Sequence, residues 1–338
     1  MTERGASVAD RDPFVSIVIP TKNVADILPA CLASIAALDY PRDRYEVVVA
    51  DGRSSDETVR IASSAGARVV DDGGRGHCRV FGLNAALPTV DAPYVAFLDA
   101  DCRVQPDWLR MGLRNFADPL VAGVGGPVPA DPSSSLLSRA ILTTLALVPT
   151  PNVPSAEKDV LHLPGCNAIY RVDVVRQVFP LPEVECDDVT LSKSVRGMGL
   201  RLRHDPSMVV LHSPYYDSLR EFARHMRLYG YARRELEAYD LGWRTWPSTL
   251  ACTSVIWMPA VALVDLIGLL AGASVLVAAV LLQLLALALV MLRALQRSRS
   301  SRIMLLSAPL LVIGALSYSW GYLTAGRFGT AGSASGTS

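Results

Sequence analysis

The sequence lacks several features that would each indicate a class of protein. Its six cysteines stand far apart with no CxxC pair, which gives no sign of a zinc ribbon or a dense disulfide framework. We expect reduced, mostly buried thiols in a cytosolic compartment. With 32 basic and 32 acidic side chains the net charge is zero, so nothing in the composition points to a nucleic-acid partner. The opening stretch MTERGASVADRDPF has no apolar run, so no signal peptide is visible and residues 1–13 are expected to be disordered.

Two nucleotide-binding signatures are also missing. No GxGxxG turn follows the first apolar run, and no GxxxxGK[ST] occurs, which disfavours a dinucleotide-binding fold and a P-loop. The histidines at 162, 204 and 212 show no metal-like spacing, so we expect core or surface residues there.

Long apolar runs are abundant in the last third of the chain. About twenty residues cross a bilayer as a helix, and the runs fit three spans, at about 250–270, 273–292 and 303–325. Asp265 lies in the first of these, where it either has a function or reaches the interface. The Gly/Ser-rich residues 326–338 are expected to form a flexible tail.

Charge around these runs sets their orientation. The segment between the second and third runs carries four arginines and the turn near residue 270 carries no basic residue. The positive-inside rule then places the arginines and the N-terminal domain in the cytoplasm. We therefore predict a multi-pass protein of the plasma (inner) membrane whose first domain is cytosolic.

The first two thirds of the chain, residues 14–217, alternate between two patterns. Continuous apolar runs predict strands, and apolar residues at helical spacing between them predict helices; the strands are expected at 14–20, 45–52, 67–72 and 94–102, and the helices at 24–38, 56–66 and 77–87. Alternating strands and helices predict an α/β fold with a mostly parallel sheet and helices on both faces.

Three predicted strands end in polar residues, namely Thr21-Lys22-Asn23, Asp51-Gly52 and Asp99-Ala100-Asp101. Ligands bind beyond the carboxyl ends of parallel strands, so these ends are expected to meet at one edge. If the last segment is extended, Asp99 and Asp101 point the same way. Two such carboxylates suit a hard cation, Mg²⁺ or Mn²⁺.

Five motifs occur in order between about Val15 and Gly230: VSIVIPTKN, VVVADGRSSDET, FLDADC, GCNAIYR and CDDVTLSKSVRGMGLRLRHDP. Together they resemble the family 2 inverting glycosyltransferases, which have the GT-A fold. The apolar C-terminal runs and the stretch REFARHMRLYGYARRE are similar to the membrane-bound subgroup of the succinoglycan-biosynthesis glucosyltransferase type. Leu228 stands where processive synthases have Trp, which argues against a processive enzyme.

The resemblance implies a donor site. Asp51 corresponds to the acid that binds the nucleotide base, and Asp99 and Asp101 to the D-x-D motif, with Asp101 the favoured metal ligand and Asp99 the favoured contact to ribose or base. The first motif contributes Pro20, Thr21 and Asn23 to the donor site. Arg79 corresponds to a residue that meets the diphosphate, unless it only lies on a helix surface.

The resemblance also implies a base and an acceptor site. Asp188 corresponds to the base, with Asp187 as an alternative base or an acceptor contact; both acids also suit a helix N-terminus. Gly165 and Asn167 either approach the sugar or form an ordinary strand turn.

Two further segments bear on the membrane. Residues 218–246 predict amphipathic interfacial helices, in which Arg224 and Arg227 suit lipid headgroups or a diphosphate. Residues 134–149 predict either an interfacial helix or a buried core helix.

The sequence thus predicts transfer of a sugar from a nucleotide-sugar, with UDP as the expected nucleotide, to a polyprenyl-linked or other lipid-linked acceptor. Two alternatives are a polyprenyl-phosphate sugar synthase and an inactive scaffold of an envelope polysaccharide complex. The acids Asp51, Asp99, Asp101 and Asp188 argue against the scaffold.

Overall fold

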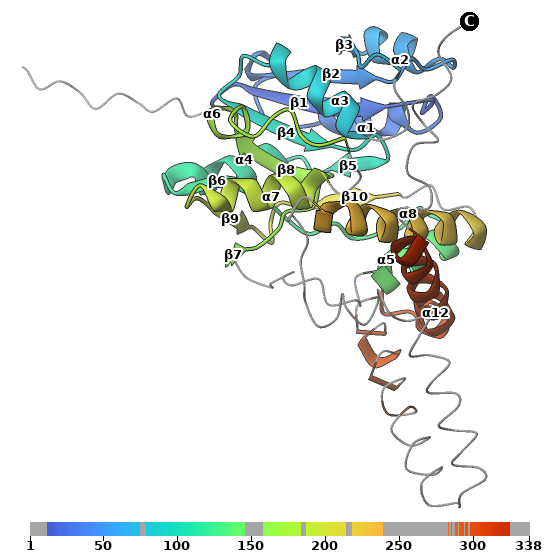
Figure 1. The fold of residues 1–338 in the computed structure, drawn as a ribbon. Coiled ribbons are helices and arrows are strands. Elements are labelled where there is room, and N and C mark those ends of the chain that lie inside the picture. Colours follow the sequence, from blue (N-terminus) through green and yellow to red (C-terminus); the bar gives the residue numbers. More distant parts are fainter. Residues whose placement is uncertain are drawn as a thin grey trace, which may run out of the picture. The chain divides into compact units, whose positions relative to one another are not determined.

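The computed structural model describes residues 12–74, 79–145, 158–183, 187–213, 218–238 and 298–324, with scattered positions between 283 and 296 (Figure 1). The chain divides into two compact units. The first comprises Met1–Val128, Pro151–Glu183 and Asp187–His212, and the second Pro129–Thr150, Val184–Cys186 and Ser213–Ser338.

A mixed sheet of eight strands forms the centre of the first unit, in the order β3-β2-β1-β4-β8-β6-β9-β7. Its strands are β1 (Val15–Thr21), β2 (Tyr45–Asp51), β3 (Arg68–Asp71), β4 (Tyr94–Leu98), β6 (Val121–Gly125), β7 (Lys158–Val160), β8 (Asn167–Arg171) and β9 (Arg201–His204). The first four in chain order are mutually parallel, as the sequence predicts. β6 and β9 are also parallel to each other, but β8 is antiparallel to both its neighbours and β7 is antiparallel to β9, so the sheet is mixed and the expected parallel arrangement fails at these two strands.

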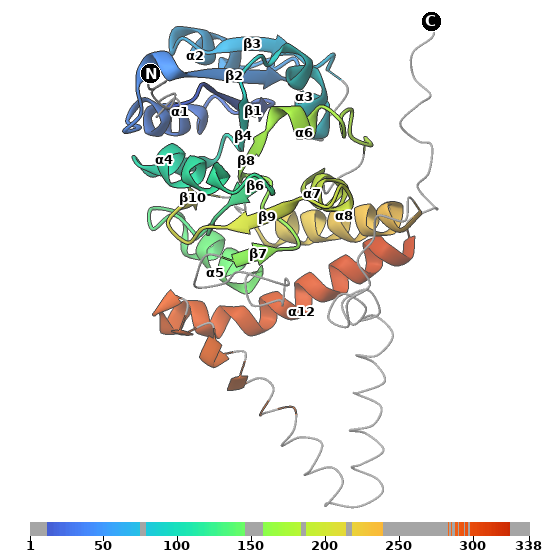
Figure 2. The ribbon, with the colours of Figure 1, turned by 90° about the vertical axis from the view of Figure 1, so that its left-hand side faces the viewer.

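Helices cover both faces of this sheet, as Figure 2 shows in a view along its edge. One face packs against α1 (Leu28–Ala36), α2 (Thr58–Ser64) and α4 (Trp108–Leu113). The other packs against α3 (Arg79–Ala86), α6 (Val172–Val175) and α7 (Asp187–Gly197). The central strand β1 serves both cores, because Ile17 and Ile19 face the first set of helices and Val18 the second. Such double coverage explains why the parallel strands are continuously apolar.

The register of the parallel strands confirms the predicted polar edge. Thr21 lies opposite Asp51 on β2, and Val18 lies opposite Phe97 on β4. The carboxyl ends of β1, β2 and β4 therefore reach the same side of the sheet.

The segment after β4 does not continue as an extended strand. The backbone N–H of Cys102 donates to the carbonyl of Asp99 at 3.1 Å, which closes a turn. The turn leads into β5 (Cys102–Val104), which pairs antiparallel with β10 (Val210–His212). The expected alternation of Asp99 and Asp101 is therefore wrong, because it needs extended backbone.

The second unit contains α5 (Leu136–Leu145), α8 (Leu219–Ala238) and α12 (Ser301–Thr324). Its core is made by side chains of all three helices, namely Ala140, Ile141, Phe222, Ile303 and Leu310. α5 lies within the segment 134–149, for which two alternatives were open, and its packing favours the buried core helix.

Among the described residues, α12 is long and apolar enough to cross a membrane. The predicted run at 303–325 is thus confirmed as an apolar helix of spanning length. The run at 250–270, with Asp265, lies outside the described residues, as do most of the run at 273–292, the segment 239–246, the tail at 326–338 and residues 1–11. The predictions made for them stay predictions.

Candidate active site

Asp51 is held at the end of β2 by hydrogen bonds to its carboxylate. The backbone N–H and the hydroxyl of Ser54 donate to it at 2.8 and 2.6 Å, and the Thr21 hydroxyl donates at 3.2 Å. Both Asp51 and Thr21 are buried. The carboxylate therefore has one fixed orientation at the edge of the sheet. The predicted hydrogen bonds from Asp51 to a nucleotide base would need such an orientation.

Pro20 and Asn23 shape the same edge. Gly82 of α3 lies so close to Pro20 that a Cβ at the glycine would be 3.1 Å from the proline Cβ. Asn23 has a φ of +53°, and its side-chain oxygen accepts the backbone N–H of Ser55 at 2.8 Å. In the structure Asn23 links the loops after β1 and β2, and Pro20 packs the end of β1 against α3. Their contact with a donor stays a prediction.

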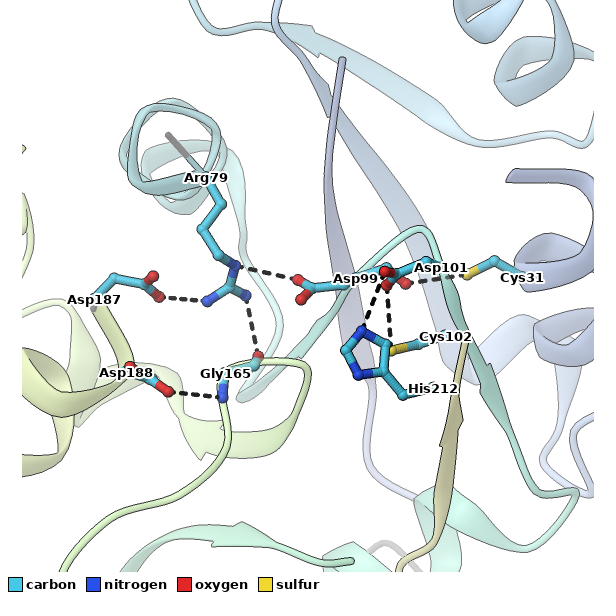
Figure 3. A network of polar contacts seen from close by, with 9 residues as sticks. All are labelled: Cys31, Arg79, Asp99, Asp101, Cys102, Gly165, Asp187, Asp188 and His212. Atoms are coloured by element: carbon cyan, nitrogen blue, oxygen red, sulfur yellow. Dashed lines mark hydrogen bonds and ion pairs between the residues drawn. The ribbon is translucent and has the colours of Figure 1, made fainter. Parts of the chain in front are cut away.

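Arg79, the first residue of α3, connects acids from two distant motifs (Figure 3). Its Nε lies 3.1 Å from Asp99 Oδ1, and one terminal nitrogen forms an ion pair with Asp187. The other terminal nitrogen donates to the carbonyl of Gly165 at 3.0 Å. Burial alone would lower the pKa of Arg79, but Asp187 and Asp99 together raise it well above its ordinary value. The helix-surface alternative for Arg79 is therefore wrong.

Asp101 points to a different partner from Asp99. Its Oδ2 lies 3.1 Å from Nε2 of His212 at the end of β10, and the Cys102 thiol donates to its Oδ1 at 3.7 Å (Figure 3). Burial would lower the pKa of His212, but the neighbouring Asp101 raises it to about 10. His212 therefore belongs to the site, and the expectation of an ordinary core or surface histidine there is wrong.

These side chains fit a divalent cation. One ligand atom from each of Asp101, Cys102 and His212 lies within 4.8 Å of the other two. Burial raises the pKa of the Cys102 thiol well above its ordinary value, so it stays protonated and is a poor ligand. The Asp101 carboxylate is the donor best suited to the ion, and His212 can join it only as a neutral imidazole, so binding of an ion there would release the proton that Asp101 stabilises. Asp99, which we also predicted as a ligand, is paired with Arg79, and burial outweighs that pairing to raise its pKa.

Asp188, in the first turn of α7, has donors on both carboxylate oxygens. Oδ2 lies 2.9 Å from His162 Nε2 and accepts the backbone N–H of Gly165 at 3.3 Å, while Oδ1 accepts the N–H of Val189 at 2.8 Å. Burial would raise the pKa of Asp188, but His162 and then Arg79 lower it below its ordinary value. Conversely, Asp188 raises the pKa of His162 against the effect of burial.

The two adjacent acids differ in access. The side chain of Asp188 is 26% exposed, whereas that of Asp187 is 7% exposed and paired with Arg79. Asp188 is therefore the acid that is both ionised and accessible to a substrate.

Gly165 and Asn167 lie in quite different surroundings. A Cβ on Gly165 would be 2.5 Å from an Arg79 nitrogen, so the absent side chain makes room for the guanidinium. Asn167 is fully buried, and its amide nitrogen donates to the carbonyls of Pro127 at 3.2 Å and Met208 at 2.8 Å. Its oxygen accepts the indole N–H of Trp108 at 2.9 Å. The predicted contact of Asn167 with sugar hydroxyls is therefore not supported, because its hydrogen bonds are used within the core.

Arg224 and Arg227 are exposed on α8 in the second unit. Their predicted role toward an acceptor stays a prediction.

His162 and His212 are the site residues that sequence reasoning missed. Each follows a short apolar strand segment, in VLH and MVVLH, just as Asp99 follows VAFL. A polar residue at the end of an apolar run was the signal that singled out the acids. Applied to histidine, it would have found both.

Comparison with known proteins shows similarity to glycosyltransferases. The model of the family "Glycosyl transferase family 2" matches residues 16–179. The chain is 28% identical over 206 residues to Glycosyltransferase AglE of Haloferax volcanii, covering 57% of this chain and 65%, just under two thirds, of that relative.

A second relative is the dolichyl N-acetyl-alpha-D-glucosaminyl phosphate 3-beta-D-2,3-diacetamido-2,3-dideoxy-beta-D-glucuronosyltransferase of Methanococcus voltae. It is 22% identical over 240 residues, covering 65% of this chain and 73% of the relative. Among solved structures, the mannosyltransferase PcManGT from Pyrobaculum calidifontis, in complex with GDP-Man and Mn²⁺, has a TM-score of 0.61 at 22% identity. The match covers 88% of this chain and 87% of that one, and shows a shared fold.

Proposed function

Because the model of the family "Glycosyl transferase family 2" matches residues 16–179, we propose that the protein transfers a sugar from a nucleotide-diphosphate sugar to a lipid-linked acceptor. The expected donor is a UDP-sugar, the expected acceptor is polyprenyl-linked, and the reaction inverts the anomeric centre. It takes place at the cytoplasmic face of the inner membrane, in polysaccharide or glycolipid synthesis.

One observation carries this proposal. Arg79 holds Asp99 of the FLDADC motif and Asp187 of the CDDVTLS motif at the same guanidinium, although the two acids are far apart in sequence. This supports the proposal because Asp99, the acid expected to contact the donor, shares a partner with Asp187, the neighbour of Asp188. A guanidinium so placed suits diphosphate oxygens, because it offers several donors in one plane.

The chemistry needs one free carboxylate. Asp188 takes the proton from the acceptor hydroxyl while that oxygen bonds to the anomeric carbon from the face opposite the leaving group. The bond from the anomeric carbon to the diphosphate oxygen breaks, and its electrons leave with the nucleoside diphosphate. Asp187 stays paired with Arg79 and is the weaker candidate for the base. His162 and the Gly165 amide orient Asp188.

Asp101 and His212 are the residues that would hold Mg²⁺ or Mn²⁺. A divalent ion there offsets the negative charge that grows on the departing diphosphate. Asp51, fixed by Ser54 and Thr21, accepts hydrogen bonds from the nucleotide base.

Three observations support a lipid-linked acceptor. The Methanococcus voltae relative is named for a dolichyl-linked sugar phosphate, and the apolar helix α12 supports attachment to membrane lipids. The exposed arginines of α8 are suited to lipid phosphate.

The proposal is tested by supplying membranes that contain the protein with Mn²⁺, radiolabelled UDP- or GDP-sugars, and a lipid extract. We expect label in the lipid phase, a loss of about 10²–10⁴-fold in Asp188→Asn, and loss in Asp101→Ala and after chelation. The matched control is Asp173→Asn, because Asp173 is an exposed acid paired with Arg171.

Each other outcome is informative. Full activity in Asp188→Asn would contradict the assigned base. A product whose mobility matches a lipid phosphate bearing one sugar would identify a polyprenyl-phosphate sugar synthase. Absence of both turnover and donor binding would favour the inactive scaffold.

A further inference from the structure

One side of α12 is covered by other helices from its first turn to its last. Near its start Ile303 and Leu310 are buried against Ala140 and Ile141 of α5 and against Phe222 of α8. Leu306 and Ile313 are partly buried against the same cluster. These α12 residues recur three or four apart, so they form one face of the helix.

The second half of α12 is in backbone contact with α8 through glycines. A Cβ on Gly230 of α8 would be 1.9 Å from the carbonyl oxygen of Tyr318, and one on Gly321 would be 1.9 Å from that of Arg227. Tyr322, one turn after Tyr318 on α12, is also in contact with α8, because the Arg234 guanidinium lies 5.3 Å from the centre of its ring. α12 therefore cannot move into a different environment unless α8 goes with it.

α8 is unsuited to the interior of a bilayer. Its exposed side chains include the guanidinium groups of Arg220, Arg224, Arg227 and Arg234. A charged side chain at the centre of a spanning helix costs about 2.5–3.5 kcal/mol. If α12 crossed the membrane, the packed helix would carry several of these charges toward the hydrocarbon.

The opposite side of α12 is an apolar stripe that no described residue covers. It consists of Leu305, Val312, Leu316, Trp320 and Leu323, again at helical spacing, with Leu305 61% and Trp320 54% exposed. Exposed arginines at 299 and 302 stand at its beginning. An apolar stripe with an aromatic near its end and cations beside it matches a bilayer surface with anionic headgroups.

We propose that α12 lies in the plane of the membrane surface, with this stripe in lipid, and does not cross the bilayer. This inference rests on the membrane attachment included in the proposed function. It means that the two ends of α12 are on the same side of the membrane, in contrast to the three-span topology expected from the sequence.

Spin labels along the stripe test the orientation. Single cysteines replace Leu305, Val312 and Leu323 in a full-length chain without its six native cysteines, reconstituted in vesicles with anionic lipid. An interfacial helix places all three labels at one shallow depth, about 5–10 Å below the surface. A spanning helix places Val312 near the centre of a hydrocarbon layer about 30 Å thick and the other two at its edges. Either that pattern or labels fully exposed to water would overturn the proposal.

A second measurement keeps all six native cysteines in place, in case the cysteine-substituted chain does not fold. An epitope is added after Ser338, or inserted between Arg299 and Ser300, and its digestion by protease is compared in right-side-out and inside-out vesicles. We expect both epitopes to be cut in the same vesicle orientation; opposite orientations would overturn the proposal. Neither readout depends on sugar transfer, so failure of the proposed activity is recognised separately.

Discussion

The Arg79 guanidinium forms ion pairs with both Asp187 and Asp99. Removing it takes this cation away from one buried carboxylate and one half-buried carboxylate. For Arg79→Ala we expect a loss of about 3–5 kcal/mol in the free energy of unfolding, together with loss of transfer. Arg53→Ala is the control, because Arg53 and Asp71 form an ion pair that is mostly exposed and contributes about 0–1 kcal/mol. Denaturant unfolding in detergent measures both, and equal losses would contradict the assignment.

His162 keeps Asp188 ionised, and this determines how its substitution affects the pH profile. In His162→Gln the carboxylate loses a cationic neighbour but stays largely shielded from water, so the pKa of Asp188 rises. We expect the acidic limb of kcat/KM to move to higher pH, while activity above neutrality changes little. A profile that falls uniformly without moving would show that His162 acts through folding alone.

The pair of Asp188 and His162 also makes the free energy of unfolding depend on pH, and the two residues act in opposite directions. The pKa of Asp188 is lowered on folding, so its contribution is present above its ordinary value and is lost as pH falls through the folded pKa. The pKa of His162 is raised, so its contribution is full below its ordinary value and is lost as pH rises through the folded pKa. The ion pair therefore stabilises the protein in the interval between the two folded values.

At the scale of elements, the crossing of α8 and α12 depends on residues without side chains. Gly230→Ala puts a methyl group against the backbone of Tyr318, so the helices must separate. We expect a loss of about 1–3 kcal/mol or more in the free energy of unfolding. Gly197→Ala is the control, because Gly197 ends α7 with open space around it, and there we expect no loss or a gain of up to about 1 kcal/mol. A shift of thermal unfolding in Gly197→Ala as large as in Gly230→Ala would contradict the argument.

The elements predictable from sequence are those whose signal is local. β1, β2, β3 and β4 are short apolar runs bounded by turn residues, and the helices between them have an apolar face, so their type and order follow from pattern alone. The polar edge follows as well, because parallel strands share one direction. Asp99 could therefore be named from the pattern, whereas Arg79, Asp187 and Asp188 were named from the resemblance to the family 2 glycosyltransferases.

The remaining elements depend on pairings that no local pattern encodes. The antiparallel insertion of β8 beside β4 joins segments about seventy residues apart, and the pairing of β5 with β10 joins segments about a hundred residues apart. That second pairing sets the turn after Asp99 and brings His212 to Asp101. The burial of Asn167 likewise depends on Trp108, which is distant in sequence. Family motifs identified Asn167 as polar and near the site, but its partners are set by tertiary packing.

At the scale of the whole molecule, the second unit interrupts the first. The chain leaves the sheet after Val128, contributes α5 to the second unit, and returns at Pro151. A chain that ends at His212 therefore keeps α5 but lacks α8 and α12, which cover its apolar side chains. We expect this truncation to aggregate, and we expect replacement of residues 129–150 by a Gly/Ser linker to restore solubility. The soluble fraction after centrifugation measures both; equal solubility would show that α5 does not need the second unit.

This interruption also determines the order in which the parts of the second unit emerge from the ribosome. α5 ends at Leu145 and α12 begins at Ser301, about 156 residues later. At about 5–20 residues per second, roughly 8–30 s pass between the two, and α8 emerges partway through that interval. The second unit is therefore begun before the sheet of the first is complete and is finished last. During that delay α8 and α12 are not yet available to cover the apolar face of α5, so we expect a chaperone that binds apolar segments to raise the yield of folded protein.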